Sequence, residues 1–142
     1  MIRVLIVGTG TMANDHADAF VAMDGVDVVG SVDPNPKNLH AFNAKYGITH
    51  AFDSVEHAIA WGQFDAVSVV TPDSVHHRAT MPFLAAGKHV LCEKPLATAA
   101  SDASEMAMAA RTAGVVNMVN LTYRNVPALM QAAAIVAEGQ IG

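Results

Sequence analysis

A glycine-rich turn near the start of the chain has the spacing that a bound dinucleotide requires. After the apolar run Val4–Val7, the sequence continues Gly8-Thr9-Gly10-Thr11-Met12-Ala13. Gly8 permits a tight turn, Gly10 lets the backbone approach a pyrophosphate, and Ala13 is small enough for a helix to pack close to the strand. The free N–H groups and the dipole at the helix start then face the anion. The pattern therefore predicts a phosphate-binding strand–turn–helix unit.

An acidic residue at the end of the next apolar run strengthens this interpretation. Asp33 follows Ala13 by 20 residues, which is the spacing expected of a carboxylate that accepts ribose hydroxyls. The same carboxylate repels a 2′-phosphate, and Lys37 is the only cation nearby in the sequence, so NAD is expected in preference to NADP. Two other interpretations stay open. One is a purely structural strand–helix turn, and the other is a nucleoside site for S-adenosylmethionine.

The segments that would position these residues alternate along the chain between apolar, strand-like runs and helix-like stretches. Apolar runs predict strands at 2–7, 26–32, 48–51, 66–70, 89–92 and 115–119. Caps, prolines and glycines predict helices at 12–23, 36–46 and 54–60, from Asp73 or Ser74 to about Gly87, from a Thr98 cap to Ala113, and from Pro127 to Glu138. This alternation favours an α/β fold with a doubly wound parallel Rossmann sheet in the strand order 3-2-1-4-5-6. The ligand is expected at the carboxyl ends of the first and fourth strands.

The composition of the chain excludes several classes of partner. It has 142 residues, 52% of them hydrophobic, with a net charge of −5 and no run of Lys or Arg. We therefore expect no binding to nucleic acid and none to membranes. One cysteine and no visible signal peptide favour the cytoplasm. The seven histidines fall in no HExxH or CxxC pattern, so no metal site is expected.

Three further motifs suggest a family. They are Thr71-Pro72-Asp73-Ser74-Val75-His76, the segment Gly87–Leu96 with its Glu93-Lys94-Pro95 core, and the tail Asn120–Arg124 followed by Glu138–Gly142. Together with the glycine turn, they resemble the Gfo/Idh/MocA family, the relatives of glucose–fructose oxidoreductase and inositol dehydrogenase, over the whole chain. The resemblance implies an oxidoreductase that moves hydride between a nicotinamide and a sugar, polyol or related carbonyl or alcohol.

The same resemblance makes Lys94 the candidate catalytic residue. An ammonium beside the nicotinamide can polarise a carbonyl, hold a substrate hydroxyl or share in proton transfer. The family often has a cis peptide before Pro95. Glu93 either orients Lys94 or is a structural acid, and the alternative for Lys94 itself is an ordinary surface lysine.

Other candidate cofactor-binding residues also follow from the resemblance. Thr71 and Pro72 are expected along the cofactor, or else they form an ordinary strand-exit turn. His76 is expected to face the cleft, and His16 to pack beneath the phosphate turn or simply to lie on a helix face. Arg124 is expected near the nicotinamide and the substrate, with a salt bridge at a domain edge as its alternative.

The resemblance also predicts the domain organisation. Residues 1–120 are expected to form the dinucleotide-binding domain, and 121–142 a boundary segment and helix leading to a mostly β-sheet substrate domain that this chain lacks. We expect the chain alone to be inactive. Its apolar stripe from Val126 to Ala137 is expected to drive homo-oligomer formation, or else to fold back onto its own sheet. The alternative function is a non-catalytic dinucleotide-binding module that acts as a sensor or an assembly domain.

Overall fold

Six strands and six α-helices alternate along residues 1–141, the part of the chain that the computed structural model describes. The strands are β1 (Ile2–Val7), β2 (Val26–Val32), β3 (His50–Phe52), β4 (Ala66–Val69), β5 (His89–Glu93) and β6 (Asn117–Asn120). The α-helices are α1 (Thr11–Val21), α2 (Pro36–Tyr46), α3 (Val55–Trp61), α4 (His76–Ala85), α5 (Ala100–Ala113) and α6 (Pro127–Ala137). Two short 3-10 turns, η1 (Asp73–Val75) and η2 (Thr122–Asn125), precede α4 and α6.

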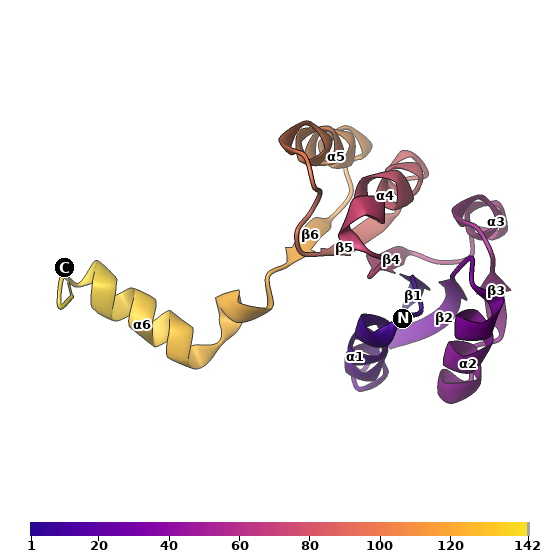
Figure 1. Cartoon of the computed structure of the whole chain (residues 1–142), viewed down its shortest axis with the longest axis horizontal. Helices are drawn as coiled ribbons and strands as arrows, with labels where there is room; N and C mark the ends of the chain where they lie inside the picture. The colour runs from indigo at the N-terminus through magenta and orange to yellow at the C-terminus, as the bar shows by residue number, and fades with distance from the viewer. Residues whose placement is uncertain (142) are drawn as a thin grey trace.

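The strands form one parallel sheet in the order β3-β2-β1-β4-β5-β6, which confirms the predicted topology (Figure 1). Helices α1 and α2 pack on one face, and α3, α4 and α5 pack on the other. Because all strands point the same way, the segments that follow β1, β4 and β5 leave the sheet at one edge. The sheet therefore places the glycine turn, Thr71 and Lys94 along the same rim.

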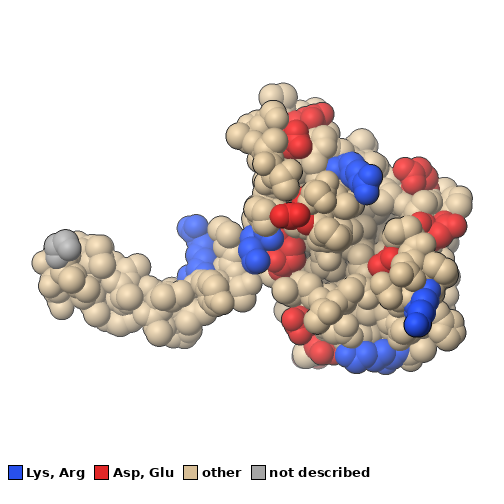
Figure 2. Space-filling view, in the orientation of Figure 1, with Lys and Arg blue, Asp and Glu red and all other residues tan. Residues whose placement is uncertain are grey.

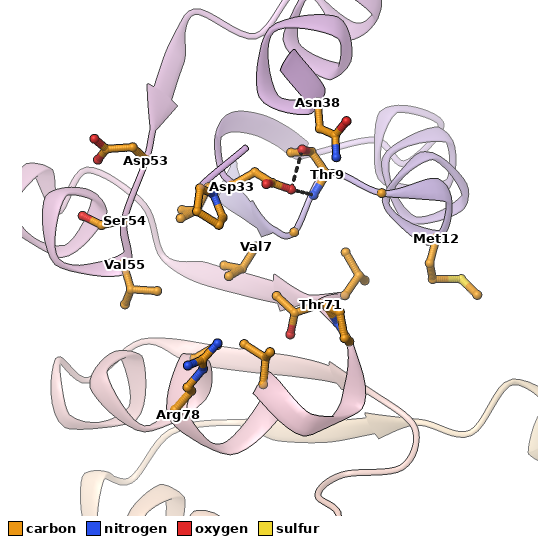
Figure 3. A pocket seen from close by; sticks show the side chains of 18 of the residues that line it. Val7, Thr9, Met12, Asp33, Asn38, Asp53, Ser54, Val55, Thr71 and Arg78 are labelled. Carbon is orange, nitrogen blue, oxygen red and sulfur yellow. Dashed lines mark hydrogen bonds between the residues drawn. The ribbon is translucent and has the colours of Figure 1, made fainter. Parts of the chain in front are cut away.

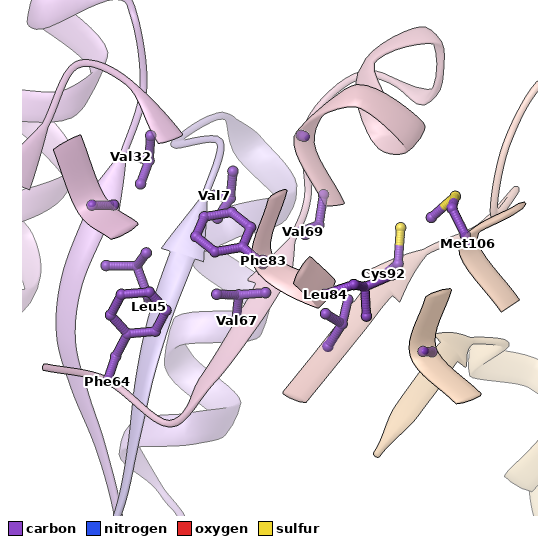
Figure 4. Close-up of a cluster of buried hydrophobic side chains, with 14 residues drawn as sticks. Leu5, Val7, Val32, Phe64, Val67, Val69, Phe83, Leu84, Cys92 and Met106 are labelled. Carbon is purple, nitrogen blue, oxygen red and sulfur yellow. The ribbon is translucent and has the colours of Figure 1, made fainter. Parts of the chain in front are cut away.

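The central strands β1 and β4 are buried on both faces, and this is why they read as apolar runs rather than alternating patterns. In β1, Leu5 and Val7 face the larger core, while Ile6 faces the smaller one under α1 and α2. Phe64 and Phe83, both fully buried, fill the larger core between the sheet and α4 (Figure 4). Each such side chain contributes about 1.5–3 kcal/mol of transfer free energy, so the sheet centre is a rigid base for the rim.

Strands β3 and β6 begin later than the sequence predicts, because the helix end before each strand takes up two more residues. The glycines that end α2 and α5, Gly47 and Gly114, adopt left-handed conformations. The N–H of Ile48 then bonds back to the carbonyl of Asn43, and the N–H of Val115 to that of Ala110. These apolar residues complete the helix ends, so β3 starts at His50 and β6 at Asn117.

Two predicted helix starts also need correction. The residue before α5 is Ala99, and no side chain caps this helix, so the predicted Thr98 cap is wrong. The helix predicted from Asp73 or Ser74 begins instead as the turn η1, closed by a bond from the Val75 N–H to the Pro72 carbonyl, and α4 starts at His76. The other element boundaries differ from the prediction by at most two residues.

Helix α6 projects away from the sheet as an arm (Figure 1). None of its residues is buried, and it packs mainly against η2. Residues 126–137 include no charged side chain, and the arm is accordingly almost uncharged beyond its base (Figure 2). The fold-back onto the sheet is therefore not what the structure shows. No helix within residues 1–141 combines the length and the apolar character that crossing a membrane demands.

Candidate functional site

A pocket of about 900 Å³ lies at the carboxyl edge of the sheet. Its wall combines the glycine turn, the end of β2, the start of α3, the segment after β4 and the first turns of α4 (Figure 3). The volume falls in the range of small-molecule and cofactor sites. It occupies the place that the sheet topology predicts for the ligand.

The glycine turn forms one end of this pocket. Gly8 has φ +91°, and a Cβ there would lie 3.0 Å from the Thr71 backbone nitrogen, so only glycine fits. At Gly10 a Cβ would meet nothing within 4 Å, because the backbone faces the open pocket. Gly10 precedes α1 with no side-chain cap. The Ala13 N–H donates to the Gly10 carbonyl at 3.2 Å, which leaves the N–H groups of Thr11 and Met12 free for an anion. Thr9, Thr11 and Met12 line the pocket, and Ala13 is buried behind them.

Asp33 faces this turn from the end of β2. Its Oδ2 accepts hydrogen bonds from the Thr9 N–H at 2.8 Å and the Thr9 hydroxyl at 2.7 Å (Figure 3). Its Oδ1 accepts from the Asn35 N–H at 2.8 Å. A carboxylate offers about four acceptor sites, so about one stays open, on Oδ1. Asp33 can therefore take one ribose hydroxyl directly, and it takes both only if the Thr9 hydroxyl turns away.

Thr71 supplies an unpartnered polar group to the same pocket. Its hydroxyl oxygen is buried and has no hydrogen-bond partner within the described residues, and Thr71 and Pro72 both line the wall. A buried hydroxyl without a partner is unfavourable. A polar ligand in the pocket would satisfy it once the Thr71 side chain rotates, because the hydroxyl oxygen is inaccessible as the side chain stands. The glycine cradle, the carboxylate and this hydroxyl together fit a dinucleotide.

Sequence reasoning missed Arg78, which lines the pocket from α4 opposite Asp33 (Figure 3). Its side chain is exposed, and the described residues offer it no salt-bridge partner. Its place in the pocket depends on how α4 lies beside α3 and the sheet edge, which no local sequence pattern indicates.

Lys94 follows β5 and is exposed, outside the pocket wall. Strand β4 separates β5 from β1, and neighbouring strands lie about 4.8 Å apart, so the segment after β5 begins about 10 Å from the glycine turn. The Lys94–Pro95 peptide is cis, as the resemblance implies.

A buried polar network lies directly behind Lys94. Glu93 Oε1 accepts from His16 Nε2 at 3.0 Å and from Asn120 Nδ2 at 2.5 Å, and Oε2 accepts from the Lys94 N–H at 3.1 Å. The other ring nitrogen of His16 lies 2.8 Å from the Ser68 hydroxyl. A carboxylate only accepts, so Nε2 of His16 carries a proton and donates to Glu93. No sequence pattern indicates Ser68 as a partner of His16 or Asn120 as a partner of Glu93.

The network lowers the pKa of Glu93. Burial by itself raises the pKa of this carboxyl, but the hydrogen bonds from Asn120, His16 and the Lys94 N–H together bring it below the ordinary value of 4.5. A carboxyl whose pKa is lower in the folded state than in the unfolded state stabilises the fold at pH values above its unfolded-state pKa. This contribution is lost as the pH falls through the folded-state pKa. Glu93 therefore makes the protein more sensitive to acid.

We expect Glu93→Gln to lower the free energy of unfolding at neutral pH by about 1–3 kcal/mol. The NH2 of the introduced amide replaces a carboxylate oxygen and cannot accept from the N–H donors around it. The deficit relative to wild type should shrink below pH 4.5, where wild type begins to lose its own contribution. Urea denaturation at neutral and acid pH measures both values. Glu105→Gln, at an exposed glutamate that pairs with His77, is the control. An identical deficit at both pH values would contradict the assignment.

Two other residues that the sequence predicts for the cofactor site lie outside the pocket wall. His76 is fully buried, with ring nitrogens 2.7 Å from the Pro95 carbonyl and 2.9 Å from the Thr71 carbonyl. It joins the segments after β4 and β5 rather than facing the open cleft. Arg124 lies in η2, exposed, at the base of the α6 arm.

These features match one family of known proteins. The Gfo/Idh/MocA profile, described as an oxidoreductase family with an NAD-binding Rossmann fold, matches residues 2–121. The chain belongs to this family. It is 37% identical to the 1,5-anhydro-D-fructose reductase of Ensifer adhaerens over 142 residues, all of this chain and 43% of the relative. It is 32% identical to an NADP(+)-dependent scyllo-inositol 2-dehydrogenase of Bacillus subtilis, over 83% of this chain and 36% of the relative.

A comparison with solved structures supports the same assignment, because the fold of this chain superposes on that of a known dehydrogenase. The WlbA dehydrogenase of Bordetella pertussis, in complex with NADH and UDP-GlcNAcA, superposes with a TM-score of 0.93 at 32% identity. The alignment covers 99% of this chain and 43% of that one. The chain thus spans less than half the length of these relatives, and the relatives include both NAD(H) and NADP(+) proteins.

Proposed function

We propose that this chain is the cofactor-binding part of an oxidoreductase that transfers hydride between NAD(H) and a sugar, polyol or related carbonyl or alcohol. The observation that carries the proposal is the single pocket shared by the glycine turn, Asp33 and the unpartnered Thr71 hydroxyl. Helix α1 faces the pyrophosphate, Asp33 takes a ribose hydroxyl, and Thr71 and Pro72 lie along the cofactor. When bound, the nicotinamide supplies or accepts the hydride.

Lys94 carries the proposed catalytic role. Its exposed ammonium follows β5 at the same rim, where it can polarise a carbonyl or hold a hydroxyl of the substrate. We assign residues 1–120 to the dinucleotide-binding domain and 121–142 to a segment that leads to a substrate domain. Gly142, the end of that segment, lies outside the described residues. The single buried cysteine, Cys92, supports a cytoplasmic location.

We expect this chain alone to bind NAD without oxidising polyols or sugars at a useful rate. Hydride transfer needs the substrate carbon held about 3–3.5 Å from the nicotinamide with a proton-transfer group in reach, and Lys94 is exposed. The test measures NADH formation with a polyol and sugar panel, for this chain and for the longest product of its gene. Turnover by the longer product alone is the expected result.

Turnover by the 142-residue chain would contradict this expectation. Cofactor binding without turnover by the longer product would instead favour the non-catalytic binding module. Lys94→Ala in the longer product serves as the matched variant, since it removes the proposed ammonium without touching the pocket wall.

We propose further that the chain self-associates through α6. Leu129, Met130 and Val136 are 49%, 57% and 57% exposed on a helix with no buried residue. Each buried side chain of this kind contributes about 1.5–3 kcal/mol, against an association cost on the order of 4–15 kcal/mol. A weak dimer is the expected outcome.

Light scattering over a concentration series tests this association. The variant carries Leu129→Glu together with Met130→Lys, and it should stay monomeric at concentrations where wild type is dimeric. Met108→Lys, at a 60% exposed position on α5, is the control and should dimerise like wild type. A wild type that is monomeric throughout, or a double variant that dimerises equally, would rule out this surface.

A further inference from the structure

We propose that His16, Glu93 and Asn120 are positioning residues, which fix Lys94 relative to the helix that binds the cofactor phosphates. This inference rests on the proposed function for the catalytic role of Lys94. The contacts among the residues themselves stand independently of it.

The Glu93 carboxylate is held from three sides. His16 and Asn120 donate to one oxygen, and the Lys94 N–H donates to the other. Glu93 is only 5% exposed, so water does not compete for these bonds. With its donors in place, the side chain of Glu93 has one position, and that position fixes the peptide nitrogen of Lys94.

The donors come from elements that are far apart in the sequence. His16 lies on α1, little more than one turn after Thr11, where the helix begins at the phosphate end of the pocket. Asn120 ends β6, and Ser68, which bonds to His16, lies on β4. The network therefore spans three neighbouring strands and joins them to α1. It sets the position of Lys94 against the same helix start that faces the pyrophosphate.

Such a link matters because hydride transfer depends on alignment. A displacement of about 1 Å at the reacting groups can cost about a hundredfold in rate. Burying a carboxylate is unfavourable, and apolar residues of similar size would fill such a place at lower cost. A role in holding the Lys94 backbone explains why the charged group is there, whereas packing alone does not.

The experiment uses the full 142-residue chain and three network variants. His16→Leu and Asn120→Leu each remove one donor to Glu93. His16→Gln keeps a donor that can reach the carboxylate. His77→Leu is the matched control, because His77 bonds to Glu105 near the surface and touches no member of the network. The readouts are the Lys94 backbone amide resonance in ¹⁵N–¹H NMR spectra and the affinity for ADP-ribose by calorimetry.

We expect His16→Leu and Asn120→Leu to move the Lys94 amide proton upfield, because its bond to the Glu93 carboxylate loosens. His16→Gln should return it toward the wild-type position, and His77→Leu should leave it unmoved. ADP-ribose lacks the nicotinamide and reports only on the phosphate and ribose contacts, so its affinity should change by less than about twofold. A general disturbance of α1 would weaken ADP-ribose binding and would not be relieved by glutamine.

Two results would overturn the proposal: an unmoved Lys94 resonance in both leucine variants, or an equal displacement in His77→Leu. If His16→Leu does not fold, Asn120→Leu decides, because Asn120 is only partly buried at the end of β6. Failure of wild type to bind ADP-ribose would count against the proposed function alone. The Lys94 resonance would still decide whether the network holds this residue.

Discussion

Replacing Gly10 by valine is expected to weaken NAD binding by about a hundredfold, equivalent to about 2.7 kcal/mol, while the fold persists. A Cβ at this position would meet no atom within 4 Å apart from those of its chain neighbours, and it would extend into the pocket where the pyrophosphate is expected. The residue has an ordinary extended conformation, with φ −77° and ψ −164°, which valine adopts without strain. Isothermal titration calorimetry gives the affinity, and thermal unfolding gives the stability.

The control for this variant is Ala22→Val. Ala22 closes the other end of α1 and is exposed, so it receives the same branched side chain far from the pocket. This variant should bind NAD like wild type. Wild-type affinity in Gly10→Val, with an intact fold, would mean that the phosphates do not lie at the start of α1.

Asp33→Ala is expected to abolish most of the preference for NAD over NADP, which should be at least about tenfold in the wild type. Two charges 4 Å apart near a protein surface interact with about 4 kcal/mol, and part of this is lost here because Asp33 is partly exposed to solvent. Arg78 across the pocket offers the only arginine in the wall. The ratio of the two dissociation constants, rather than either value, is the measured quantity, since the variant also frees the Thr9 N–H.

Asp27→Ala is the matched control for this prediction. Asp27 is exposed at the amino end of the same strand, β2. Its substitution therefore removes one negative charge at a position away from the pocket. Its ratio should equal that of wild type. Tighter binding of NADP than NAD by wild type, or an unchanged ratio in Asp33→Ala, would contradict the role of this carboxylate.

The features that the sequence predicts correctly are those that local chemistry decides. Strand order follows from the regular alternation of elements, and the turn at Gly8 follows from a backbone conformation that only glycine adopts readily. The late starts of β3 and β6 were missed because Ile48 and Val115 look like strand residues, although each completes the helix end before it. Apolar character alone does not separate those two environments.

The parts of the site that depend on distant contacts could not be read from the sequence. Glu93 was recognised from its motif, but its donors His16 and Asn120 lie 77 and 27 residues away along the chain. His76 was expected to face the cleft, yet it is buried between two backbone carbonyls. Arg78 shares the pocket with Asp33 only because α3, α4 and the sheet edge converge there.

Calorimetric titration of the unmodified chain with NAD, and separately with S-adenosylmethionine, tests the central claim most directly. Both ligands carry an adenosine, and both are compatible with a glycine turn followed by a strand-end acid, but only NAD places a pyrophosphate at the start of α1. We expect one NAD molecule to bind per chain in the pocket of about 900 Å³. S-adenosylmethionine brings no pyrophosphate to the start of α1 and is expected to give no measurable heat. Binding of S-adenosylmethionine in place of NAD, or of neither ligand, would contradict the assignment of this pocket to a nicotinamide dinucleotide.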